Sequence, residues 1–125
     1  MKIRCTTNSI RLRLRKSDIQ ELESNHHIQE TLQISPDTKF HFELAIAKGI
    51  PHPNVHQKDD HMTVYLPESA ANQWIHSNQV GIEYYKPVAD SKLQILIEKD
   101  FPCLDRENED KSDTFWELAD KPDQC

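Results

Sequence analysis

The sequence predicts an α+β fold made of two tandem repeats, each reading strand, short helix, strand and strand. Three observations carry this prediction: a weak internal duplication, apolar residues that alternate along the strand segments, and a helix-start signal in each copy. We expect the two copies to form one barrel-like or strongly curved antiparallel sheet with pseudo-twofold symmetry. Two short helices are expected at its ends.

The duplication appears when residues 12–31 are aligned with residues 64–83, an offset of 52. Apolar positions then coincide in both copies: Leu14 falls on Leu66, Leu22 on Trp74 and Ile28 on Val80. With one residue inserted, "KFHFEL" (39–44) also matches "KLQILI" (92–97). The order of elements matches as well, so Leu22 and Trp74 are expected at equivalent buried positions on the two helices.

In the first copy, alternation predicts a half-buried strand whose apolar face is Ile10, Leu12 and Leu14. Ser17 followed by Gln20 is a helix-start pattern, and Ile19 and Leu22 give that helix an apolar stripe. Two further strands are expected after the helix. Their apolar residues are Ile28, Leu32 and Ile34, then Phe40, Phe42, Leu44 and Ile46.

The second copy repeats this order, with Pro67 suited to the first turn of its helix. We place the repeats at about 9–47 and 62–98, joined by an exposed loop over 48–61. Residues 1–104 are expected to form a single α+β domain. Residues 105–125 are expected to be an acidic C-terminal tail.

Charge is strongly segregated along the chain. The formal net charge is −6, and residues 98–125 carry all of it, because they contain ten acids and four bases. Residues 1–16 contain six bases and no acid. The start of the chain lacks the unbroken apolar run of a signal peptide, and no segment approaches the length of a membrane span. These features predict a cytoplasmic protein without a membrane partner, and its three cysteines are expected to be reduced.

Two resemblances support parts of this prediction. The second copy, "MTVYLPESAANQWIHSNQVGIEYY", resembles the swapped-hairpin units of AbrB-type proteins, in which a strand ending in Leu-Pro enters a short helix. In addition, "MKIR", "NSIRLRL", "VGIE", "LIEKDF-x-CL" and "ED-x-SD" together resemble a family of small bacterial proteins of unknown function. That resemblance runs from Met1 to about Asp113 and implies no activity.

The acidic stretch Asp105–Asp113 holds five carboxylates, which could form a metal or catalytic site. A calcium loop of EF-hand type starting at Asp105 would need Gly and Glu where Asp110 and Trp116 stand. No ligand spacing typical of zinc is present, so we predict neither metal nor cofactor. Cys103 has no evident base nearby in the sequence, so we predict no catalytic residue. A metal-dependent hydrolase at this segment stays a minor alternative.

Arg11, Arg13 and Arg15 share one face of the first predicted strand. Such a row could contact nucleic-acid phosphates, but it lacks interleaved aromatics, and the acidic stretch has the matching sign. The sequence therefore favours a small non-catalytic binding or regulatory module, with a homodimer or another protein as partner. Nucleic-acid binding is the alternative. The candidate interaction residues are Arg11, Arg13, Arg15, Cys103, Asp105, Glu109, Asp110, Asp113 and Trp116.

Overall fold

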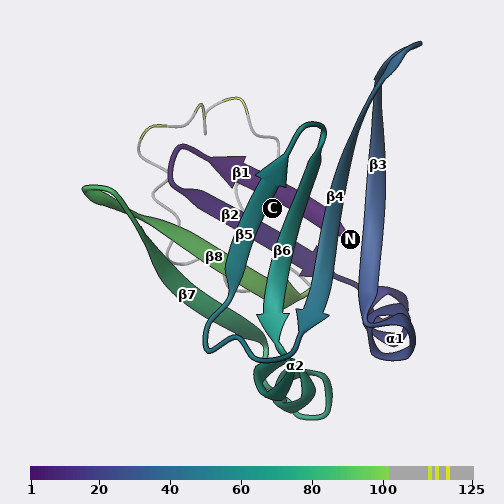
Figure 1. Cartoon of the computed structure of the whole chain (residues 1–125), viewed down its shortest axis with the longest axis vertical. Coiled ribbons are helices and arrows are strands. Elements are labelled where there is room, and N and C mark those ends of the chain that lie inside the picture. Colours follow the sequence, from purple (N-terminus) through teal and green to yellow (C-terminus); the bar gives the residue numbers. More distant parts are fainter. Residues whose placement is uncertain (102–112, 114, 116–117, 119–125) are drawn as a thin grey trace.

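The structure is a computed structural model that describes residues 1–101, 113, 115 and 118. Within this part of the chain, eight strands form two sheets, and two short helices lie together at one end of them (Figure 1). The elements are β1 (Lys2–Thr6), β2 (Ser9–Leu14), α1 (Lys16–Asn25), β3 (His27–Ser35), β4 (Thr38–Ala47), β5 (Asn54–Lys58), β6 (His61–Pro67), α2 (Glu68–Ile75), β7 (Gly81–Val88) and β8 (Ser91–Lys99).

Each sheet has four strands and mixes both halves of the chain. Sheet A has the order β1-β2-β8-β7, and sheet B has the equivalent order β5-β6-β4-β3. The central pairs, β2 with β8 and β6 with β4, are parallel, whereas the outer pairs are antiparallel hairpins. Each half therefore contributes its first hairpin to one sheet and its second hairpin to the other.

The α+β class and the two helices are confirmed, but the prediction of one barrel-like or strongly curved antiparallel sheet was wrong. The described residues form two separate mixed sheets and no closed barrel. Helix α1 follows β2 in sheet A and leads into β3 in sheet B, so β2 pairs with neither β3 nor β4, the next two strands along the chain. Alternation identifies the face that a strand buries, but it does not identify the neighbouring strand.

The two halves also share their strand registers. Lys2 pairs with Arg13 in sheet A, and Asn54 pairs with Tyr65 in sheet B, an offset of 52 at both positions. The offset differs from 52 in the second hairpin of each half, β3–β4 and β7–β8. There Ile82 takes the position that Ile28 has in the first half. The alignment of Ile28 with Val80 was therefore wrong, and Val80 is half exposed.

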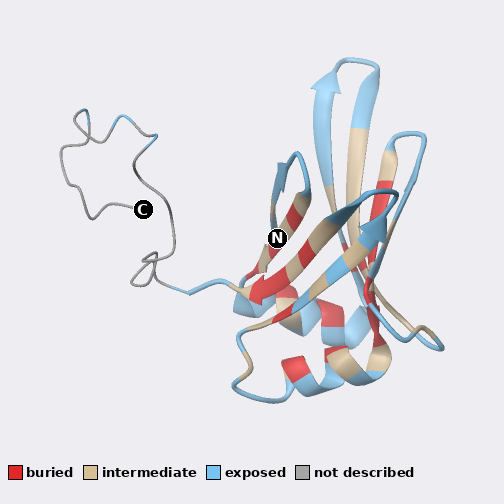
Figure 2. Ribbon diagram, turned by 90° about the vertical axis from the view of Figure 1, so that its left-hand side faces the viewer, coloured by how far each residue is buried: buried red, intermediate tan, exposed pale blue. Residues whose placement is uncertain are grey.

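The core lies between the two sheets and the helices (Figure 2). Leu22 and Trp74 are both fully buried, which confirms their predicted equivalence. The indole N–H of Trp74 donates a 3.0 Å hydrogen bond to the carbonyl oxygen of Val80, so its one polar group is satisfied. The other buried apolar residues come from both halves: Ile10, Leu12, Leu14, Ile28, Leu44, Met62, Val64, Leu66, Ala71, Ile82, Ile95 and Ile97.

Two local predictions differ from the structure. Residues 54–58, which the sequence places in the linking loop, form the edge strand β5. Val55 is the only apolar residue in that strand, so the alternation is too weak to identify it. Helix α1 begins at Lys16 rather than being capped by Ser17, and the backbone N–H of Arg15 donates to the Asp18 carboxylate at 2.9 Å.

Candidate anion-binding face

Four cationic side chains share one face of sheet A, the face turned away from the core. In the β1–β2 register, Arg4 lies opposite Arg11 and Lys2 lies opposite Arg13. Residues directly opposite in an antiparallel pair project to the same side, with Cβ atoms roughly 5 Å apart. Lys2, Arg4, Arg11 and Arg13 therefore form a compact two-by-two array, which we call the basic corner.

A single carboxylate within the described residues contacts the basic corner. The parallel register of β2 and β8 puts Glu98 opposite Arg13. The Oε1 atom of Glu98 lies 2.8 Å from Nε of Arg13 and 3.5 Å from Nε of Arg11. The Glu98 side chain is only 12% exposed, so this contact is well shielded from solvent.

The described part of the chain supplies no carboxylate partner for Lys2 or Arg4. Lys2 and Arg4 therefore add two positive charges to this face that no described carboxylate contacts. Like charges placed directly opposite each other in a sheet are destabilising. A bound anion would relieve that repulsion, so the arrangement favours an anionic ligand on this face.

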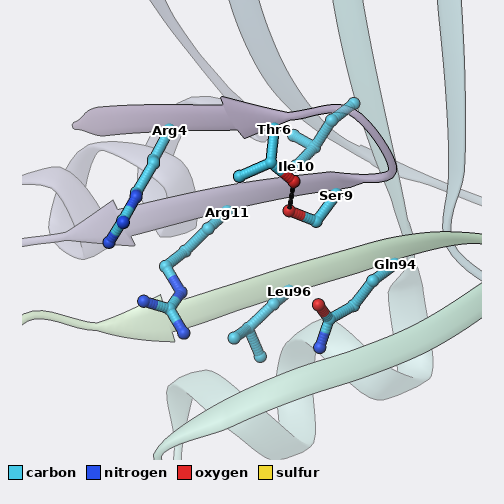
Figure 3. Close-up of a pocket in the computed structure, with 7 residues that line it drawn as sticks. All are labelled: Arg4, Thr6, Ser9, Ile10, Arg11, Gln94 and Leu96. Carbon is cyan, nitrogen blue, oxygen red and sulfur yellow. Dashed lines mark hydrogen bonds between the residues drawn. The ribbon is translucent and has the colours of Figure 1, made fainter. Parts of the chain in front are cut away.

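Two shallow hollows lie over this face. One, of about 200 Å³, contains Arg4 and Arg11 together with the hydroxyl groups of Thr6 and Ser9 (Figure 3). Figure 3 shows the two arginine side chains extending toward the same side from neighbouring strands. The second hollow, of about 300 Å³, is lined by Lys2, Ile3, Arg4, Arg11 and Arg13. Guanidinium, ammonium and hydroxyl groups are all hydrogen-bond donors suited to carboxylate or phosphate oxygens.

Arg15, the third arginine of the predicted row, stands apart from the basic corner. It follows the last residue of β2 and forms the N-cap of α1, and its side chain is 70% exposed. Its Nε atom lies 3.9 Å from the carboxylate of Asp18. Burial alone would raise the pKa of Asp18, but hydrogen bonds from the Arg15 N–H and the Met1 ammonium group outweigh it and hold the pKa below its usual value.

Most of the acidic stretch cannot be placed relative to this face. Cys103, Asp105, Glu109, Asp110 and Trp116 lie outside the described residues, and the described Asp113 is exposed. Their pairing with the arginines stays a prediction. Lys2 and Arg4 were not among the predicted interaction residues. The alternation in "KIRC" before the Thr7–Asn8 turn was the signal for a hairpin that pairs them with Arg13 and Arg11.

The corresponding face of sheet B holds a different set of polar groups. His61 Nε2 lies 2.9 Å from the Glu43 carboxylate, and His41 Nδ1 lies 3.0 Å from the Thr31 hydroxyl. The two histidine rings are 5.7 Å apart between centroids. Across the residues that the structure describes, no cluster of three or more His, Cys, Asp or Glu side chains could hold a metal ion.

A family model matches residues 1–118, which is nearly the whole chain. The chain belongs to the DUF7009 family. DUF7009 is a family of unknown function, so membership confirms the predicted resemblance and brings no activity with it. Neither the curated proteins nor the solved structures that were compared with this DUF7009 chain include a match. None of the helices in its described part is long and apolar enough to cross a membrane.

Proposed function

We propose that the protein is a small non-catalytic binding module that holds an acidic protein segment against the basic corner. The observation that supports this most directly is the pair of cations Lys2 and Arg4, which lie opposite Arg13 and Arg11 and have no carboxylate partner in the described part of the chain. Glu98 also shows how a carboxylate oxygen can lie between two guanidinium groups on this face. Arginine suits such contacts because its planar donor array matches the geometry of a carboxylate.

The chain itself contains a segment of the required charge. Strand β8 ends at Lys99 beside Leu14 of β2, and the acidic stretch Asp105–Asp113 follows a few residues later. We propose that this stretch competes with an external acidic partner for the basic corner. Each exposed ion pair contributes only about 0–1 kcal/mol, so a partner of higher affinity can replace it. Such competition would lower the apparent affinity of the basic corner for an external acidic partner.

A labelled peptide with the sequence of residues 105–113 tests this proposal by fluorescence anisotropy. The full-length protein is compared with a full-length variant in which the five acidic residues of that stretch are changed to Asn or Gln. The variant should bind the peptide more tightly, because its own tail no longer competes. Arg4→Gln in the variant should weaken binding, as should added salt.

Lys92→Gln is the matched control, since it removes one exposed cation from the far end of β8. Equal peptide binding by Arg4→Gln and Lys92→Gln would rule out the basic corner as the binding site. Equal binding by the wild type and the amide-tail variant would rule out the competition.

Nucleic-acid binding is the second candidate, because phosphates could follow the two rows of cations along β1 and β2. Two observations weigh against it. Glu83 and Glu98 place negative charge on the same face of the sheet, and among the described residues of that face Tyr85 is the only aromatic residue available for stacking. A gel mobility shift that depends steeply on salt and is lost in Arg4→Gln would favour this candidate over the first.

A further inference from the structure

Strand β3 lies at one edge of sheet B, and among the described strands β4 is its only neighbour. At the start of this pair, the Ile46 N–H donates a 2.9 Å hydrogen bond to the His26 carbonyl oxygen. Residues that bond across an antiparallel pair alternate with residues that do not. The backbone N–H and C=O groups of Gln29, Thr31 and Gln33 therefore point away from β4, toward the open edge.

The four edge strands of the two sheets differ in how well they are protected. Proteins protect such edges with short strands, lysines and prolines, because an open edge can pair with a strand of another molecule. Strands β1 and β5 have five residues each, with Lys2 and Arg4 in β1 and Lys58 in β5. Strand β7 contains Lys86 and Pro87. Strand β3 has nine residues without Lys, Arg or Pro, so it is the least protected edge.

The same strand also exposes apolar side chains. Leu32 is 51% exposed and Ile34 is 60% exposed, and both lie on the face of β3 that carries the buried Ile28. This part of the β3–β4 hairpin extends beyond the other strands of sheet B, at the end away from the helices (Figure 1). A strand added at this edge would bond to the open backbone groups and cover apolar surface at the same time.

We infer that β3 pairs with β3 of a second copy of the chain, antiparallel and about a twofold axis at Thr31. The two B sheets would then form one continuous sheet across an interface made of the same residues on both sides. Thr31 lies opposite Thr31 of the second copy, and Gln29 lies opposite its Gln33. This register brings the outward backbone groups together, and these pairs end before the irregularity between Gln33 and Ser35.

The charges of the edge fit a second copy in this register. Glu30 is the only charged residue of β3, and its carboxylate accepts a 3.0 Å hydrogen bond from the Met1 ammonium group. With the axis at Thr31, Glu30 lies opposite Leu32 of the second copy. An axis one residue earlier would place two Glu30 carboxylates opposite each other, which is unfavourable, whereas a Thr–Thr pair is favourable.

Sedimentation equilibrium of the full-length protein tests this inference with two variants of opposite charge. The wild type should form a reversible dimer as its concentration is raised. Thr31→Lys and Thr31→Glu should each weaken self-association about tenfold or more, because each places like charges opposite each other. An equimolar mixture of the two variants should restore the dimer, since the lysine of one copy then faces the glutamate of the other.

Gln57→Lys is the matched control, because Gln57 is an exposed residue of β5, the other edge of sheet B. It should associate as the wild type does, and circular dichroism confirms that all variants fold. A wild type that stays monomeric at every concentration would overturn the inference. A dimer that Thr31→Lys leaves intact would also overturn it, as would a mixture that fails to restore association.

This inference is independent of the proposed function, because β3 belongs to sheet B and the basic corner belongs to sheet A. Arg4→Gln should leave the dimer unchanged, and Thr31→Lys should leave binding of the acidic peptide unchanged. A dimer that is lost in Arg4→Gln and kept in Thr31→Lys would assign self-association to the basic corner and overturn the pairing of β3.

Discussion

Sheet A and sheet B share their topology and register, yet their two faces have diverged to different degrees. On the inner faces, equivalent positions hold Leu12 and Val64, or Leu44 and Ile97, and all four side chains are buried. The outer faces differ in charge. The positions of Lys2, Arg4, Arg11, Arg13 and Glu98 in sheet A are taken in sheet B by Asn54, His56, Thr63, Tyr65 and Ala45.

This difference separates the residues that the fold requires from the residues that it does not require. The inner faces meet in one core, so every inner position must be apolar and of suitable size. Sheet B has the same strand order without a cluster of four cations, so the basic corner is not needed to form such a sheet. A charged cluster that the fold does not need, and that places like charges opposite each other, supports the proposed binding role of this face.

The largest expected effect comes from the equivalent helix residues of the shared core. Trp74→Ala should lower the free energy of unfolding by about 3–5 kcal/mol, and Leu22→Ala by about 2–5 kcal/mol. Trp74→Ala also leaves the Val80 carbonyl without its indole donor. Urea denaturation followed by circular dichroism measures both losses. Two separate transitions in either variant would contradict a single core shared by the two halves.

The two sheets place the small residue on opposite strands of one equivalent pair, Gly81 with Glu98 in sheet A and His27 with Ala45 in sheet B. A Cβ atom at Gly81 would lie 2.9 Å from the Ile97 carbonyl oxygen and 3.1 Å from Cβ of Glu98. In sheet B the arrangement is reversed, because His27 lies opposite the small Ala45. Gly81→Ala should therefore destabilise the protein by about 1–3 kcal/mol through overpacking.

His27→Ala is the matched control for Gly81→Ala. His27 is exposed, so its truncation should change the unfolding midpoint in urea very little. If the two variants unfold at the same urea concentration, the close approach at Gly81 does not govern the packing of β7 against β8.

Removal of one carboxylate charge from each outer face sharpens the comparison between them. Glu98→Gln removes the carboxylate charge that contacts Arg11 and Arg13 and should cost about 1–3 kcal/mol of stability. Glu43→Gln affects a contact with His61 that is more exposed and should cost about 0–1 kcal/mol. Thermal unfolding of both variants at low and high salt measures the difference. A larger cost for Glu43→Gln would show that the basic corner tolerates its charge without Glu98.

The sequence was sufficient for features that repeat at a fixed spacing. The offset of 52 correctly relates Leu22 to Trp74 and holds in both first hairpins, because one core imposes the same size and polarity on both halves. The sequence alone could not predict the exchange of hairpins between sheets, because β2 and β8 pair through residues that are far apart along the chain. The basic corner was half predicted for the same reason: Arg11 and Arg13 are neighbours in sequence, whereas Glu98 reaches them only through that parallel pairing.

The smallest expected effect lies at the start of the two helices, where the Asp18 carboxylate of α1 accepts a hydrogen bond from the N-cap backbone and Glu68 of α2 does not. Asp18 receives hydrogen bonds from the Arg15 N–H and the Met1 ammonium group, whereas α2 has Ala70 at the equivalent position. Because the pKa of Asp18 is below its ordinary value of 3.8, the charged carboxylate stabilises the fold above that pH. This contribution is lost as the pH falls below 3.8 and through the lower pKa of the folded state. Asp18→Asn should cost about 1 kcal/mol near neutral pH, similar to the loss of a helix cap, and the cost should shrink as the pH falls through that range. Urea unfolding of wild type and Asp18→Asn from neutral to acidic pH measures this directly, and a difference between them that does not change with pH would contradict the assignment.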